Sequence, residues 1–146
     1  MNRFRRLAAG LLAAGVVLAP LRAQYEDAGV RGAYFSKKTY APAPLPDFAA
    51  SRAALPQPVL ADNPEYVELY WRAWELAFAH LRQPPAGSPL VSNYLDAAFS
   101  ANVFQWDTVF MTLYGRYAHH VFPAIQSLDN FYCRQYANGY ICREIV

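Results

Sequence analysis

The chain has 146 residues, of which 55% are hydrophobic and 16% aromatic, and its formal net charge is +2. Four of its thirteen basic side chains lie in the first 23 residues, so the rest carries nine basic against eleven acidic groups, a net of about −2. No basic cluster remains there that could follow a phosphate backbone. This balance excludes a general affinity for nucleic acid.

Residues 1–23 have the layout of a secretory signal peptide. A basic start precedes the apolar run from Leu7 to Leu21, and Leu21-Arg22-Ala23 offers a cleavage site. The run is shorter than the roughly 20 apolar residues that span a bilayer, and it contains Pro20. We expect a mature chain that begins near Gln24, is periplasmic or secreted and has no permanent membrane anchor. A retained anchor is the alternative interpretation.

Residues 24–61 are rich in alanine and proline. Each proline removes a backbone donor and disfavours helix at the preceding residue, which predicts an extended leader that wraps a surface. A flexible linker is the alternative, although Tyr34, Phe35, Tyr40 and Phe48 favour partial docking.

A first helix is expected from Pro64 to about Arg82. Asn63 is a good N-cap and Pro64 suits the first helical position. Apolar residues recur at three- and four-residue steps, which predicts one buried face. The residues of that face are Val67, Tyr70, Trp71, Trp74, Phe78 and Leu81. Residues 84–87, Pro-Pro-Ala-Gly, end the pattern.

The remaining elements follow with less regular spacing. Residues 89–105 sustain no period and are expected to cross the fold as an irregular segment. A second helix is predicted from Thr108 to Phe122, and a third from Pro123 to Tyr136. Residues 138–139, Asn-Gly, are a plausible stop, after which residues 140–146 form a short strand or extended segment. The expected buried residues of the second helix are Val109, Phe110, Leu113, Tyr114, Tyr117 and Val121.

Long helical patterns without comparable alternating strands predict an all-α fold over residues 62–146. Cys133 and Cys142 are the only cysteines, and they could form a disulfide or remain free thiols. No metal site is expected from two cysteines, and the adjacent His119 and His120 point about 100° apart on a helix. The sequence also has no phosphate-binding glycine loop and no nucleophile elbow, and it implies no cofactor.

The segment Phe104-Gln105-Trp106-Asp107-Thr108 places a carboxylate beside an indole at the start of a helix. An aromatic ring can stack on the apolar faces of a sugar while a carboxylate accepts hydrogen bonds from its hydroxyls. With the helix that follows, the segment resembles the Trp-Asp motif of six-hairpin glycosidases, such as trehalase, mannosyl-oligosaccharide glucosidase and mannosylglycerate hydrolase-like enzymes. The resemblance extends over residues 63–145 and includes residues 92–96, Ser-Asn-Tyr-Leu-Asp, and 131–135, Phe-Tyr-Cys-Arg-Gln.

The resemblance implies an (α/α)6 toroid of which this chain supplies the first helical hairpins. It also implies that Asp107 binds hydroxyls of a glycoside or oligosaccharide, that Trp106 shapes the pocket, and that Gln105 and Gln135 are further candidates. Hydrolysis by inversion needs two opposed carboxyl groups, and no spacing pairs Asp107 with Asp96, Asp129 or Glu144. No catalytic residue is therefore assigned, and the chain alone is not expected to hydrolyse glycosides.

A longer reading frame past Val146 is expected on this hypothesis. In the simplest alternative for the motif, Asp107 only caps its own helix. Two alternatives apply to the whole chain. One is a small exported helical carbohydrate-binding or interaction module, and the other is a periplasmic structural protein without a ligand.

Overall fold

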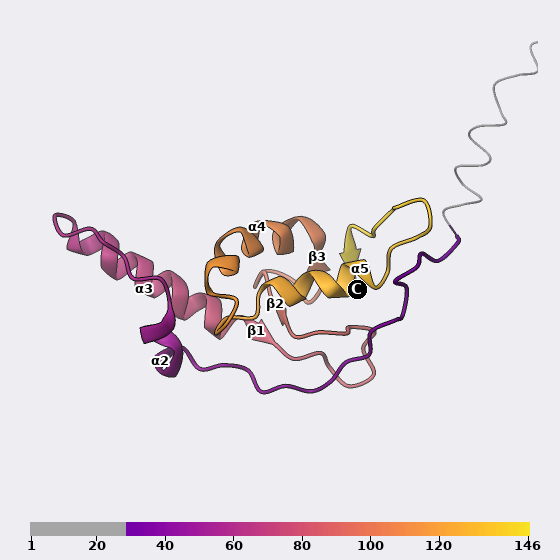
Figure 1. Cartoon of the computed structure of the whole chain (residues 1–146), viewed down its shortest axis with the longest axis horizontal. Helices are drawn as coiled ribbons and strands as arrows, with labels where there is room; N and C mark the ends of the chain where they lie inside the picture. Colours follow the sequence, from indigo (N-terminus) through magenta and orange to yellow (C-terminus); the bar gives the residue numbers. More distant parts are fainter. Residues whose placement is uncertain (1–28) are drawn as a thin grey trace, which may run out of the picture.

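The computed structural model describes residues 29–146, which form a helix-rich fold with small strands (Figure 1). The expected signal peptide and residues 24–28 lie outside the described residues. The elements in chain order are α2 (Phe48–Ser51), the 3-10 helix η1 (Arg52–Ala54), α3 (Pro64–Ala79), β1 (Leu81–Arg82), β2 (Tyr94–Leu95), β3 (Val103–Phe104), α4 (Gln105–Gly115), the 3-10 helices η2 (Arg116–Ala118) and η3 (Ile125–Leu128), α5 (Asp129–Tyr132) and β4 (Glu144–Ile145).

The all-α expectation is too narrow, because the strands pair into two small antiparallel sheets. In one sheet β1 pairs with β2, with Leu81 opposite Leu95. In the other, β3 pairs with β4, with Val103 opposite Ile145. The segment expected to be irregular therefore contains two strands. Each is two residues long, which is too short to show the alternation by which a strand is recognised in a sequence.

The described part of the leader lies against the rest of the fold. The Gly32 amide donates to the carbonyl of Gln135 at 2.8 Å, and the Tyr40 hydroxyl donates to Asn93 Oδ1 at 2.8 Å. The leader also forms a short helix, α2, in which Asp47 accepts a hydrogen bond from the Ala50 amide. These contacts favour the docked form over a flexible linker for this part of the leader.

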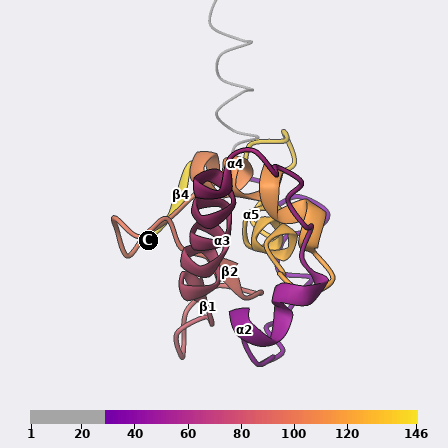
Figure 2. The ribbon, with the colours of Figure 1, turned by 90° about the vertical axis from the view of Figure 1, so that its left-hand side faces the viewer.

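Helix α3 begins at Pro64 as predicted but ends at Ala79 instead of near Arg82. It stops early because Leu81 and Arg82 are extended and pair with β2. Figure 1 shows the N-terminal half of α3 projecting from the fold, while its C-terminal end meets β1. Figures 1 and 2 both show α2 beside that end, where the Phe48 and Phe78 rings lie 5.7 Å apart.

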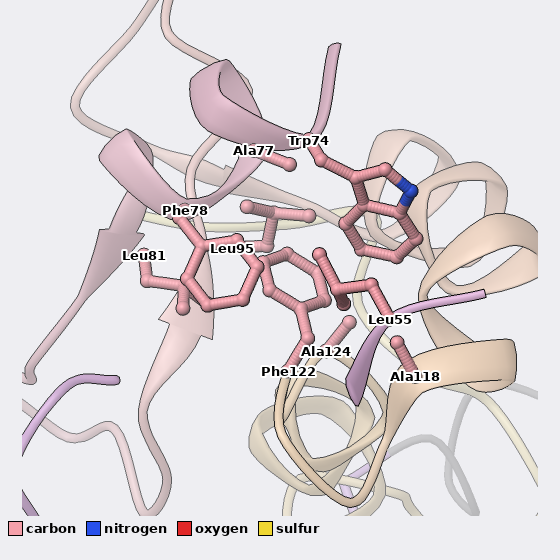
Figure 3. Packing of buried hydrophobic residues seen from close by; sticks show 9 residues of the cluster. All are labelled: Leu55, Trp74, Ala77, Phe78, Leu81, Leu95, Ala118, Phe122 and Ala124. Carbon is pink, nitrogen blue, oxygen red and sulfur yellow. The ribbon is translucent and has the colours of Figure 1, made fainter. Parts of the chain in front are cut away.

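The main hydrophobic core lies where α3, β1 and β2 meet the turn after η2 (Figure 3). Phe122 is at its centre, with its ring 5.3 Å from that of Trp74 and 4.9 Å from that of Phe78. The predicted apolar face of α3 is thus buried at its C-terminal end. The cluster consists of Leu55, Trp74, Ala77, Phe78, Leu81, Leu95, Ala118, Phe122 and Ala124.

Helix α4 differs most from its prediction. It begins at Gln105 instead of Thr108, ends at Gly115 and continues as η2. Its buried residues are Thr108, Thr112 and Gly115. Of the residues predicted to be buried, Val121 is half-buried and the other five are exposed. At Gly115 the helix packs closely on Ala124: a Cβ added there would lie only 2.4 Å from the Ala124 Cβ.

The predicted third helix is broken into η3 and α5, which ends at Tyr132. Asn130 in α5 is fully buried and holds the neighbouring loop through its side chain. Its Oδ1 accepts hydrogen bonds from the Val91 and Ser92 amides at 2.7 and 3.0 Å, and its Nδ2 donates to the Ser92 carbonyl. Gly139 adopts φ +86° in the expected turn. Cys133 and Cys142 are free thiols, and β4 lies within the expected extended segment.

Candidate functional site

The β3–β4 sheet fixes the start of α4, where Trp106 and Asp107 lie. Phe104 ends β3 in an extended conformation and directly precedes the helix. The first helical amide, that of Gln105, donates to the carbonyl of Arg143 at 2.8 Å. One of the amides that a helix start leaves unpaired is thereby satisfied. The register of β4 on β3 consequently determines where the indole and the carboxylate lie.

Trp106 and Asp107 line one hollow of about 450 Å³. Its other lining residues are Ala97, Phe110 and Met111. The Trp106 side chain is 72% exposed, and its ring centroid lies 5.9 Å from that of Phe110. Among the described residues an exposed indole therefore stands at the edge of a hollow that also contains a carboxylate.

Asp107 is the third residue of α4 and not its N-cap, so the interpretation of Asp107 as a simple cap is wrong. Phe104 occupies the N-cap position, and no side chain there caps the helix. Negative charge in a first helical turn contributes typically about 0.3–1 kcal/mol. Within residues 29–146, no protein group donates a hydrogen bond to the Asp107 carboxylate or pairs with it. Its oxygens remain available to a ligand.

Gln105 and Gln135 are not among the residues that line this hollow. Gln105 contributes its backbone amide to the contact with Arg143. The Gln135 carboxamide donates to the Gly139 carbonyl at 3.2 Å within its own turn. In the structure Gln135 therefore supports its own turn, and its carbonyl accepts the hydrogen bond from the Gly32 amide of the leader. Of the four candidate residues, Trp106 and Asp107 are the two that line the hollow together.

The other acidic residues considered in the sequence are bound elsewhere. Asp96 lies 3.4 Å from the Arg82 guanidinium, Asp129 pairs with Lys38, and Glu144 pairs with Arg143 at 3.0 Å. None of them lines the hollow with Asp107. The described residues therefore place no second carboxylate across from Asp107, as a hydrolytic acid–base pair would need.

The two adjacent histidines contact separate backbone carbonyls. His119 Nδ1 lies 3.1 Å from the Arg116 oxygen, and His120 Nε2 lies 3.1 Å from the Ala54 oxygen. Among residues 29–146 there is no group of three or more histidine, cysteine, aspartate or glutamate side chains arranged to hold a metal. In the same part of the chain, no helix has both the length and the apolar character needed to cross a bilayer.

Phe110 and Met111 are lining residues that the sequence analysis did not assign to the site. Both were detectable, since residues four positions apart share a helix face, and these two follow Trp106 and Asp107 by four residues. Ala97 had no such signal. It is carried to the hollow by a turn in which Ala98 adopts φ +70° and its amide donates to Asp96 Oδ1 at 2.9 Å.

Comparisons of the chain with models of known protein families, with characterised proteins and with solved structures gave no match. The interpretation of the site therefore depends on the geometry of the hollow and on the motif itself.

Proposed function

We propose that the hollow beside Trp106 and Asp107 binds a sugar residue of an oligosaccharide or glycoside, and that the chain is the N-terminal, substrate-binding part of an exported glycoside hydrolase of the six-hairpin class. The observation that carries the proposal is the exposed indole next to a carboxylate that has no partner among residues 29–146. An aromatic face and a charged acceptor are the two groups that sugar recognition needs.

The proposal assigns binding and not hydrolysis to these residues. Trp106 stacks on the sugar ring, and Asp107 accepts hydrogen bonds from one or two hydroxyls. The acid and base of the reaction would come from further helical hairpins of an (α/α)6 toroid. Among the described residues that line the hollow, Asp107 is the single carboxylate, which is consistent with a purely binding role in this part of the protein.

Titration calorimetry against a panel of oligosaccharides tests the proposal. Hydrogen bonds to a charged group are worth about 1.5–3 kcal/mol, so Asp107→Asn should weaken binding by roughly 10- to 100-fold. Trp106→Ala should weaken it comparably by removing the stacking surface. Asp62→Asn is the matched control, because Asp62 is an exposed acid outside the hollow. Equal binding by Asp107→Asn and the unmodified chain would contradict the proposal.

A small exported helical interaction module is the second candidate, and the outward face of α4 favours it. Five apolar or aromatic residues of α4 are exposed on this face, and the exposed Tyr117 of η2 follows them, whereas soluble monomers seldom expose a large continuous apolar patch. We call this set the α4 stripe. It consists of Trp106, Val109, Phe110, Leu113, Tyr114 and Tyr117.

A further inference from the structure

We infer that the α4 stripe is the contact surface of a twofold dimer, in which the stripe of a second copy of this chain packs antiparallel against it. The inference names a partner for the second candidate function and does not depend on saccharide binding. Three features of the described residues support a second copy as the occupant: the symmetry of the stripe, its area and a groove at its end.

The stripe is self-complementary under a twofold axis. If two α4 helices pair antiparallel about the point between Met111 and Thr112, Phe110 lies opposite the partner's Leu113. The same pairing sets Trp106 opposite the partner's Tyr117. Each pair is related by the same axis, as an interface between identical subunits requires. None of the stripe residues carries a charge, so no charged side chain of the stripe loses its hydration when two stripes pack together.

The exposed area is sufficient for a specific contact. The four aromatic side chains of the stripe are 40% to 72% exposed. At about 200 Å² for a whole aromatic side chain, they present roughly 450 Å² per copy, and Val109 and Leu113 raise this to about 600 Å². If the contact covers the whole stripe, a pair of copies buries about 1,200 Å², the lower end of the range for specific interfaces.

A groove of about 420 Å³ lies at the C-terminal end of the stripe. Tyr117 belongs to both the groove and the stripe, and Trp74 forms part of the groove wall. Trp74 is only 6% exposed. The groove is lined by Pro56, Tyr70, Ala73, Trp74, Tyr114 and Tyr117.

The groove and the opposite end of the stripe complement each other. In the antiparallel pairing, the projecting Trp106 of one copy reaches Tyr117 at the edge of the partner's groove. An aromatic anchor beside an apolar groove is the arrangement that contributes most binding energy in protein interfaces. The twofold axis repeats this contact at both ends of the stripe.

Sedimentation velocity of the purified chain tests the inference. We expect a concentration-dependent monomer–dimer equilibrium with a dissociation constant on the order of 1 to 100 µM. Leu113→Glu places a charge at the centre of the contact, once from each copy, and should raise this constant at least about 100-fold. Ala73→Glu occupies the groove and should raise it at least about 10-fold. Neither Leu113 nor Ala73 lines the sugar-binding hollow.

Leu76→Glu is the matched control. Leu76 is 45% exposed against 50% for Leu113, and it lines neither the groove nor the hollow. It should leave the dissociation constant within about twofold. Circular dichroism must show that all three variants remain folded.

A monomer at every concentration would overturn the inference. It would indicate that a different helix covers the stripe, such as one in a longer polypeptide. Open-ended association, or equal weakening by Leu76→Glu and Leu113→Glu, would also overturn it. The substituted residues lie outside the hollow, so these variants test the dimer without removing a group that is assigned to the sugar. Trp106 and Phe110 belong to both the stripe and the hollow, so the dimer would cover the sugar-binding surface, and the calorimetry with Asp107→Asn is run at concentrations below the dissociation constant.

Discussion

Replacing Gly115 with alanine tests whether close packing against Ala124 determines the position of α4. In an open helix this change stabilises by about 1 kcal/mol, because glycine is a poor helix former. Here the added Cβ would lie 2.4 Å from the Ala124 Cβ, whereas carbon atoms prefer about 3.5–4.0 Å. Ala124 is fully buried and cannot move freely.

Overpacking of this kind costs about 1–3 kcal/mol. After the gain of about 1 kcal/mol in helix propensity is subtracted, we expect Gly115→Ala to lower the free energy of unfolding by about 1 kcal/mol, and by about 2 kcal/mol at most. For a domain of this size the melting temperature should fall by roughly 4–8 °C. Urea unfolding measures the free energy, and calorimetry measures the melting temperature. Both should be recorded below the concentration at which the inferred dimer would form.

The reciprocal change provides the control. Ala124→Gly alone should destabilise by loss of a buried methyl group, about 1 kcal/mol. Combined with Gly115→Ala it restores space for one methyl group, so the double variant should be more stable than the sum of the two single effects by at least about 1 kcal/mol. A Gly115→Ala chain as stable as the original, or strictly additive changes, would refute the packing argument.

Three further predictions concern buried polar groups and one tyrosine. Asn130→Ala should lower the free energy of unfolding by about 3 kcal/mol or more in urea, because it leaves the buried Val91 and Ser92 amides without an acceptor; a loss below about 1 kcal/mol would contradict this role. Thr108→Val should stabilise by about 1 kcal/mol in the same assay, because the buried Thr108 Oγ1 has no hydrogen-bond partner among the described residues; a destabilised variant would indicate a missed partner. Burial raises the pKa of Tyr114 above its usual value, so the neutral phenol stabilises the fold below about pH 10 and this stabilisation is lost as pH rises through the folded-state pKa. Tyr114→Phe should therefore flatten the alkaline decline in melting temperature, and an unchanged decline would argue against the shift.

The sequence predicted the first helix well and the second poorly, for one physical reason. Apolar periodicity shows that a helix has two different faces but not which of them is buried. In α3 the C-terminal part of the apolar face packs around Phe122. In α4 the face with Thr108, Thr112 and Gly115 is inside, and at Gly115 there is no room for a side chain beside Ala124. That preference depends on a residue in a later element and is not visible in the local pattern.

The short strands were also beyond local prediction. Leu81 continues the three- and four-residue spacing of apolar side chains in α3, and the helix propensities of Leu81 and Arg82 alone would extend the helix through them. Their partners, Tyr94 and Leu95, lie more than ten residues away, and their pairing ends the helix at Ala79. For the candidate site, the motif predicted Trp106 and Asp107 by type and spacing, whereas the turn that brings Ala97 beside them depends on a left-handed Ala98.

The site and the stripe share one support at the C-terminal end of the chain. β4 pairs with β3 through Val103 and Ile145, and the Arg143 carbonyl holds the first amide of α4. Ile145 is buried with Phe131 in the second apolar cluster, so these contacts are tied to α5. A slip of β4 by one residue would expose Ile145 and would move the carbonyl from the Gln105 amide. The direction of α4 therefore depends on Phe131, Arg143 and Ile145, which are distant in sequence from the motif. The position of the Asp107 carboxylate and the orientation of the α4 stripe depend on the same three residues.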